Sequence, residues 1–145
     1  MLDMPCGDMC YMPLVLDQIW MRNPSFDYTG VDIVPTVIEE HQQKFAPLGA
    51  KMSFMQMDAV KSPQLPPVEL VYSRWMMNHL CEDDVVKILS KVHKSGAKYA
   101  LMTHTDLEGE AHATHPMSCD YAMLTQKVTD VGAMAVQTTL YDLTK

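Results

Sequence analysis

The chain has 145 residues, of which 48% are hydrophobic and 20% are charged. This length and apolar content suit one core, so we assign residues 1–145 to a single domain. The formal net charge of −7 argues against a broad electrostatic surface for nucleic acid or for an anionic membrane. No run of residues is long and apolar enough to cross a bilayer.

The first part of the chain predicts a strand, a helix and a second strand. Leu2 belongs to a short strand-like start, and residues 9–21 have apolar side chains at helical spacing. Pro13 is tolerated because it falls near the first turn of that helix. Residues 28–34 are rich in β-branched side chains, which predicts a buried strand that ends near Asp32.

The next segments predict a second helix and a third strand. Thr36 and Glu39 have the spacing of a capping box, which predicts a helix that begins there and runs to about Phe45. Residues 51–57 alternate in the manner of a strand that is buried on one face. Residues 62–67 contain three prolines and therefore predict a surface connection.

The second half of the chain continues the alternation. Residues 68–72 and 99–105 predict two more strands, and residues 82–93 predict an amphipathic helix between them. The inward positions of this helix are expected to be Val85, Val86, Ile88, Leu89 and Val92. After a polar loop, residues 120–131 predict a helix and residues 134–143 a final strand.

This order of strands and helices with short links predicts an α/β fold. We expect a mostly parallel, Rossmann-like sheet with helices on both faces and right-handed crossovers. Ligands of such sheets lie outside the carboxyl ends of the strands. Three segments meet there: Asp3 to Asp8 with the tight turn at Gly7, then Asp32 for the hydroxyls of a ribose, and residues 56–59 for an adenine edge.

The charges in the first of these segments favour a cationic cofactor. The dinucleotide fingerprint G-x-G-x-x-G is absent, and the carboxylates of Asp3 and Asp8 would repel a pyrophosphate. The sulfonium and ammonium groups of S-adenosylmethionine would instead be attracted. We therefore place S-adenosyl-L-methionine ahead of NAD, and a dehydrogenase remains the competing enzyme class.

Two motifs carry a resemblance to a known family. Residues 2–8, Leu-Asp-Met-Pro-Cys-Gly-Asp, resemble the first motif of class I S-adenosylmethionine-dependent methyltransferases, in a subgroup that reads L-D-x-P-C-G-D. Residues 30–35, Gly-Val-Asp-Ile-Val-Pro, are similar to its second motif. The ordered match covers about residues 1–106. A segment that helps to close the site precedes the first motif in that family, so we expect this chain to be shortened at its N-terminus.

The resemblance implies a set of cofactor-binding residues. Asp3 and Gly7 would line the methionine end, Asp32 would hold the ribose, and Asp58 with Ala59 would flank the adenine. The complete predicted set is Asp3, Pro5, Cys6, Gly7, Asp32, Ile33, Asp58, Ala59 and Arg74.

Candidate catalytic residues follow the fourth and fifth strands. Arg74 would clamp an anionic substrate or form a structural salt bridge, and His79 would be a general base or a polar packing residue. The other candidates are Trp75, Asn78, His104 and Asp106. Nothing resembles the Asn-Pro-Pro-aromatic motif of amino-methylating enzymes, which disfavours that class of acceptor.

The cysteines favour a reduced, cytoplasmic protein without a metal site. Four cysteines in a chain with no evident signal peptide suit a reducing compartment better than a disulfide framework. Two groups could suggest zinc, but neither has a standard paired-ligand spacing: Cys6 and Cys10 with His79 or Cys81, and His112, His115 and Cys119.

These observations predict a methyltransferase that acts on an unidentified acceptor. The alternative is a non-catalytic module with a shortened methyltransferase fold, which binds S-adenosylmethionine or a protein. For either function we expect no membrane and no nucleic acid as partner. A second copy of the chain or a protein partner would cover the open cofactor site.

Overall fold

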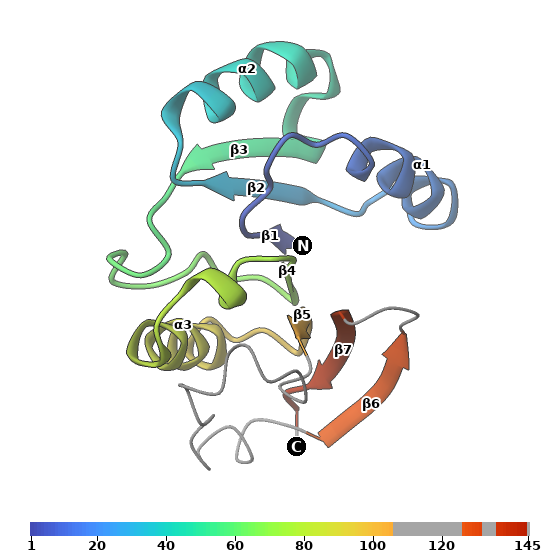
Figure 1. Cartoon of the computed structure of the whole chain (residues 1–145). Helices are drawn as coiled ribbons and strands as arrows, with labels where there is room; N and C mark the ends of the chain where they lie inside the picture. Colours follow the sequence, from blue (N-terminus) through green and yellow to red (C-terminus); the bar gives the residue numbers. More distant parts are fainter. Residues whose placement is uncertain (106–125, 132–135, 145) are drawn as a thin grey trace.

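The structure is a computed structural model that describes residues 1–105, 126–131 and 136–144. Within these ranges the chain forms a seven-stranded sheet with the order β3-β2-β1-β4-β5-β7-β6 (Figure 1). The strands are β1 Leu2–Asp3, β2 Tyr28–Asp32, β3 Met52–Gln56, β4 Leu70–Ser73, β5 Tyr99–Thr105, β6 Gln126–Val131 and β7 Val136–Asp142.

The expected mostly parallel sheet is confirmed. Strands β1 to β5 pair in parallel, whereas β7 is antiparallel to β5 and β6 is antiparallel to β7. The strand order reverses at β1, which lies between β2 and β4. The carboxyl ends of β2, β1 and β4 are therefore neighbours at the switch point of the sheet, where ligands of α/β folds bind.

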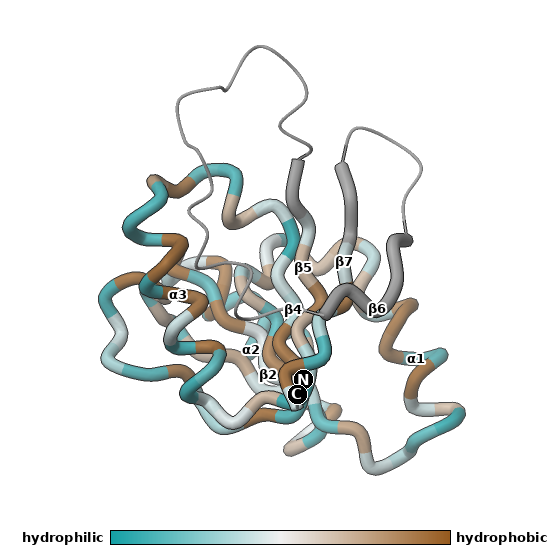
Figure 2. Tube along the Cα trace, turned by 90° about the horizontal axis from the view of Figure 1, so that it is seen from below, coloured by the Kyte–Doolittle hydropathy of each residue, from teal (hydrophilic) through white to brown (hydrophobic). Residues whose placement is uncertain are grey.

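Helices cover both faces of the sheet, as expected. The helices are α1 Met12–Arg22, α2 Pro35–Phe45 and α3 Glu82–Lys94, with short 3-10 helices η1 Ala46–Lys51 and η2 Met77–His79. Helices α1 and α3 lie on opposite sides of the strands, and both contain strongly apolar segments (Figure 2). No helix in the described ranges is long and apolar enough to cross a membrane.

Each face of the sheet has its own apolar cluster. The cluster beneath α1 and α2 consists of Cys6, Met9, Met12, Leu16, Tyr28, Ile38, Met52 and Phe54. The cluster beneath α3 consists of Leu2, Met4, Val31, Leu65, Val71, Met77, Val85, Ile88, Leu89, Val92, Ala97, Ala100 and Met102. Six methionines therefore fill core positions, in line with the flexibility of their side chains.

Two expectations about helices are wrong in detail. Thr36 is not the N-cap of α2, because the helix begins at Pro35 and its N-cap is Val34, without a side-chain cap. Proline suits the first helical position because its φ is already fixed and it needs no N–H partner there. Val86 does not face inward, since it is 41% exposed on α3, while the other four predicted positions are buried.

The helix expected over residues 120–131 is also wrong where the structure describes it. Residues 126–131 form strand β6, which pairs with β7 and has a register shift between Lys127 and Thr129. Residues 120–125 lie outside the described residues, as does the polar loop expected before them. The final strand is confirmed as β7.

Candidate functional site

The loop that follows β1 is tied to the strands on both sides. The N–H of Met4 donates to the carbonyl of Tyr72 at 2.9 Å, and the N–H of Cys6 donates to the carbonyl of Val31 at 2.8 Å. Gly7 then turns the chain with a φ of +56°, a region that glycine reaches without steric cost. A Cβ on Gly7 would have no heavy atom within 4 Å, so this turn faces open space.

Asp32 holds this turn from the end of β2. Its Oδ2 accepts the N–H of Gly7 at 3.2 Å, and its Oδ1 accepts the N–H of Val34 at 3.0 Å. The residue is only 8% exposed. Because each carboxylate oxygen has two lone pairs, Asp32 retains capacity for further donors on its exposed side.

His41 holds the same turn from α2. Its Nε2 lies 2.7 Å from the carbonyl oxygen of Gly7, and because a carbonyl can only accept, Nε2 is the nitrogen that donates. The residue is 5% exposed, and its ring packs against Phe45 and Phe54. The other ring nitrogen, Nδ1, is buried without a hydrogen-bond partner in the described part of the chain. The peptide units on either side of Gly7 are thus fixed by two side chains.

Asp3 is a buried acid at the carboxyl end of β1. It is 2% exposed, and its Oδ2 accepts a hydrogen bond of 2.6 Å from the hydroxyl of Tyr28. Burial raises the pKa of Asp3 to about 7; the Tyr28 hydrogen bond opposes this shift, and the nearby charge of Asp32 adds to it. The same burial, next to Asp3, raises the pKa of Tyr28. A cation beside Asp3 would stabilise its charged form.

The thiol of Cys6 points into the core. Cys6 is 8% exposed within the cluster beneath α1 and α2, and burial raises its pKa to about 12. Pro5 is half-buried next to it.

Asp58 organises the turn after β3. Its Oδ1 accepts the N–H groups of Val60 and Lys61, each at 3.0 Å, and these bonds hold its pKa below the ordinary value. Ala59 and Val60 are fixed in turn by Lys91 of α3, whose Nζ donates to their carbonyls at 2.8 and 2.6 Å. The turn is joined to the loop after β2, because the N–H of Met57 donates to the carbonyl of Asp32.

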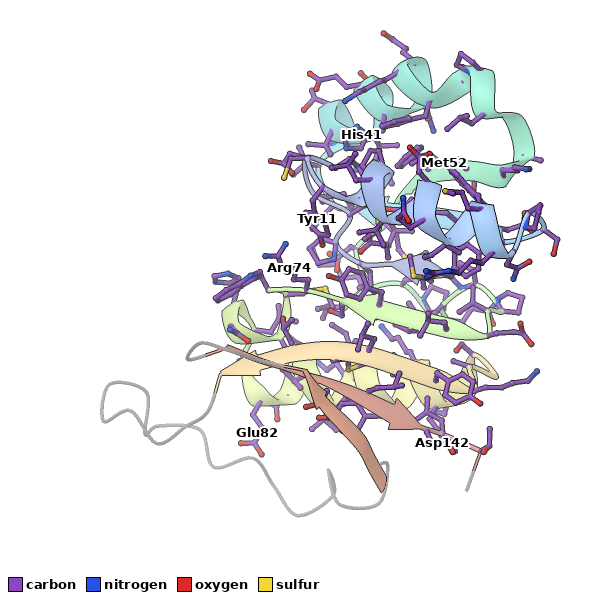
Figure 3. All side chains as sticks on the ribbon, turned by 90° about the vertical axis from the view of Figure 1, so that its right-hand side faces the viewer. Tyr11, His41, Met52, Arg74, Glu82 and Asp142 are labelled. Carbon is purple, nitrogen blue, oxygen red and sulfur yellow. The ribbon has the colours of Figure 1, made fainter. Side chains whose placement is uncertain are left out.

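The carboxyl end of β4 bears an arginine on an aromatic support. The guanidinium of Arg74 lies 4.7 Å from the ring centroid of Tyr11, and the Tyr11 hydroxyl is 2.9 Å from that of Tyr72. Figure 3 shows Tyr11 and Arg74 next to each other on one edge of the molecule, with His41 above them. Trp75 follows with a φ of +61° and 43% exposure, and its N–H donates to Oγ1 of Thr103 at 2.8 Å.

Among the residues that it describes, the structure does not bring the remaining candidate catalytic and metal-binding residues together with Arg74 at the carboxyl end of β4. Asn78 and His79 are exposed at the end of η2. The side chain of His104 and the whole of Asp106 lie outside the described residues, as do His112, His115 and Cys119. Within the described residues no group of three His, Cys, Asp or Glu could hold a metal ion, and Cys6, Cys10 and Cys81 are free thiols.

Comparison with known proteins decides the family. The sequence model described as a methyltransferase domain matches residues 1–97, which is more than half of the chain. The chain belongs to this methyltransferase domain family. A search of curated protein sequences finds no significant match.

Solved structures share the fold of this methyltransferase domain, and two of the three described here are methyltransferases. A protein from Pyrococcus horikoshii OT3 has a TM-score of 0.71 at 15% identity, with 98% of this chain and 80% of that chain covered. Human N-acetylserotonin methyltransferase, solved in complex with SAM, has a TM-score of 0.66 at 15% identity, with 97% and 46% covered. Magnesium protoporphyrin IX methyltransferase from Synechocystis PCC 6803, solved with bound SAM, has a TM-score of 0.66 at 14% identity, with 97% and 66% covered. This domain thus spans less than two thirds of the latter two proteins.

The sequence motifs of this methyltransferase domain did not reveal the side chains that support the Gly7 turn, Asp3 and Arg74. His41 is a helical histidine whose partner, the Gly7 carbonyl, lies 34 positions earlier in the chain. Tyr28 reads as an ordinary strand aromatic, and Tyr11 and Tyr72 are 61 positions apart. The one available signal was the strand-end position of Tyr72, because its neighbours in the sheet could be anticipated from the strand order.

Proposed function

We propose that this domain binds S-adenosyl-L-methionine and transfers its methyl group to an acceptor. The observation that carries the proposal is a pair of buried carboxylates, Asp3 and Asp32, at the carboxyl ends of adjacent parallel strands. They flank a turn at Gly7 that leaves open space. In this poorly hydrated setting two acids attract a cation and repel a pyrophosphate.

The residues present fit this cofactor. Asp3 suits the cationic methionine end, and the free lone pairs of Asp32 suit the two hydroxyls of a ribose. Ile33, which is 56% exposed next to Asp32, offers an apolar surface to a nucleoside. Asp58 would act chiefly by fixing the turn at Ala59, because its Oδ1 already accepts two backbone N–H groups. Pro5, Cys6 and Gly7 would contribute backbone.

The bound cofactor supplies an activated methyl group on a sulfonium. Methyl transfer is an in-line displacement, so the chain's own part is to orient the two reactants and to exclude water. Arg74 and Trp75 lie at the carboxyl end of β4, next to the Gly7 loop, where an acceptor would approach. We propose Arg74 as an acceptor-binding or cofactor-binding group and His79 as a proton acceptor for substrates that need one.

The proposal is tested by isothermal titration of the protein with S-adenosylmethionine. Asp32→Asn keeps one oxygen acceptor for the backbone and removes the charge, and we expect it to weaken binding by ~1–3 kcal/mol, the scale of a charged hydrogen bond. Asp17→Asn, on the exposed side of α1, is the matched control and should leave the affinity unchanged.

Two results would contradict the proposal. Absence of heat and of a thermal shift at millimolar S-adenosylmethionine would exclude the cofactor. Equal affinities for Asp32→Asn and Asp17→Asn would exclude Asp32 as the ribose ligand. Binding without transfer to any acceptor would instead favour a non-catalytic module.

A cytoplasmic location is also part of the proposal. It is supported by the free thiols of Cys6, Cys10 and Cys81 in the described residues, since such thiols persist best in a reducing compartment.

A further inference from the structure

Arg74 has no carboxylate partner among the side chains that the structure describes, residues 1–103 and 139–144. The ion pairs in that part of the chain are Lys61 with Asp58, Lys87 with Asp84, and Lys98 with Glu69. The salt bridge that the sequence offered as one role of Arg74 is therefore not formed with these side chains. This is notable in a chain with a net charge of −7, where acids outnumber bases.

The guanidinium of this exposed residue nevertheless has one defined contact. It lies over the Tyr11 ring at 4.7 Å, a contact that stabilises a cation through the electrons of the ring. Tyr11 is itself fixed by the hydrogen bond of 2.9 Å between its hydroxyl and that of Tyr72. Tyr72 belongs to β4 and pairs with Asp3 of β1, so the support is part of the sheet. A planar guanidinium that is fixed on one face offers its N–H edge to a two-oxygen anion.

Arg74 lies at the same switch point of the sheet as Asp3 and Asp32, so an anion bound to it would lie beside the proposed cofactor site. Asp3 and Asp32 make the β1 and β2 side of the switch point attractive to a cation, whereas Arg74 makes the β4 side attractive to an anion. Trp75, held at a φ of +61° and 43% exposed, places an aromatic surface beside it. A bulky residue in this strained region is found mostly where function maintains it.

We propose that Arg74, on its Tyr11 and Tyr72 support, is a carboxylate-binding subsite at the carboxyl end of β4. The inference rests on the proposed methyltransferase function. The carboxylate belongs either to the methyl acceptor or to the aminocarboxylate end of the cofactor, and the chemistry of recognition is the same for both.

The test compares the wild-type protein with Arg74→Gln and Arg22→Gln by calorimetric titration. Arg22, exposed in the last turn of α1, is the matched control because it removes the same charge away from the site. In the first arm the ligands are S-adenosylhomocysteine and 5′-methylthioadenosine, which lacks the aminocarboxylate. In the second arm the protein saturated with S-adenosylhomocysteine is titrated with benzoate and with its neutral analogue benzamide.

Each result supports or overturns the subsite. A loss of about tenfold or more for S-adenosylhomocysteine in Arg74→Gln, with methylthioadenosine unaffected, assigns the carboxylate to the cofactor. Benzoate binding that is lost in Arg74→Gln and absent for benzamide assigns it to the acceptor. If Arg74→Gln matches Arg22→Gln in both arms, the subsite does not exist.

A second pair of variants tests the support. Tyr11→Phe keeps the ring but loses the hydroxyl bond to Tyr72, so we expect a smaller loss of anion affinity than in Tyr11→Leu, which removes the ring as well. Equal behaviour of the two variants would overturn the role of Tyr11. If the wild-type protein binds no nucleoside at all, the proposed function fails, and titration of the free protein with benzoate and benzamide still decides the subsite.

Discussion

Gly7 is held by two side chains that come from different elements. Asp32 at the end of β2 accepts its N–H, and His41 of α2 donates to its carbonyl. Because Nε2 faces the Gly7 carbonyl, the turn is satisfied by the ring orientation and tautomer that place an N–H there. His41 is thus placed to position the Gly7 loop, the proposed cofactor loop, without facing a ligand itself.

We expect His41→Phe to weaken the binding of S-adenosylmethionine by about fivefold at most, since the ring volume remains but the bond of about 1 kcal/mol to Gly7 is lost. Gln42→Met is the matched control, because it removes a side-chain bond of 2.9 Å from the next residue of α2 to the backbone of β3. Calorimetric titration of both variants, with melting temperatures as a check on folding, distinguishes them. Equal affinities would show that His41 is only a packing residue.

The sequence predicted part of this site for a clear physical reason. Acids at the ends of adjacent parallel strands, and a glycine in the loop after one of them, must lie near the same edge of the sheet, so Asp3, Gly7 and Asp32 could be associated from the sequence. His41 could not, because its function depends on the orientation of a helix toward a backbone carbonyl. Whether Asp3, Asp32 and Arg74 bind a ligand stays a prediction until it is measured.

At the scale of elements, the packing of β2 against β3 leaves no room for a side chain at position 30. A Cβ on Gly30 would lie 2.8 Å from two ring atoms of Phe54 and 3.0 Å from the Cβ of Cys6. The missing side chain of Gly30 thus makes room for the ring that packs against Tyr28 and His41. The second motif therefore contributes to packing as well as to the predicted ribose site.

We expect Gly30→Ala to destabilise the protein by ~1–3 kcal/mol, the usual cost of overpacking a core. Phe54→Leu removes the ring atoms concerned, so the double variant should be more stable than the sum of the two single effects predicts. Urea denaturation of the four proteins measures this coupling. Strictly additive effects would mean that Gly30 and Phe54 do not compete for space.

The elements that were predicted correctly have strong internal patterns. Strands β2 and β5 are apolar runs, and α3 has a clear helical period with acids in its first turn and bases in its last. Strand β6, Gln-Lys-Val-Thr-Asp-Val, has a weak pattern of its own and is defined by its pairing with β7. Long-range pairing of this kind is the information that a local pattern lacks.

For the molecule as a whole, Asp3 links folding to pH. Its pKa is raised from 3.8 to about 7 in the folded state, so between these values the folded protein binds more protons than the unfolded chain. The stabilising contribution is complete below about pH 4 and is lost as the pH rises through 7. A cation next to Asp3 should instead bind more strongly as the pH rises, because it favours the ionised form of Asp3.

We expect the stability of Asp3→Asn relative to the wild-type protein to increase between pH 4 and pH 8. The increase in this difference of unfolding free energies should be on the order of 4 kcal/mol, since each pKa unit corresponds to about 1.4 kcal/mol. Its amide oxygen can still accept the Tyr28 hydroxyl. The affinity of the wild-type protein for S-adenosylmethionine should rise between pH 6 and pH 8, and that of Asp3→Asn should not. Parallel pH profiles for the two proteins, by denaturation and by titration, would contradict this linkage.

The chain contains two tryptophans, and they occupy very different surroundings. The indole of Trp20 is half-buried and donates to the carbonyl of Phe26 at 2.7 Å, whereas Trp75 is 43% exposed at the carboxyl end of β4. Their fluorescence therefore separates two events. We expect emission from Trp20 to follow unfolding around α1, and emission from Trp75 to change if a ligand displaces water at the carboxyl end of β4, which would make Trp75 an optical reporter of the proposed binding.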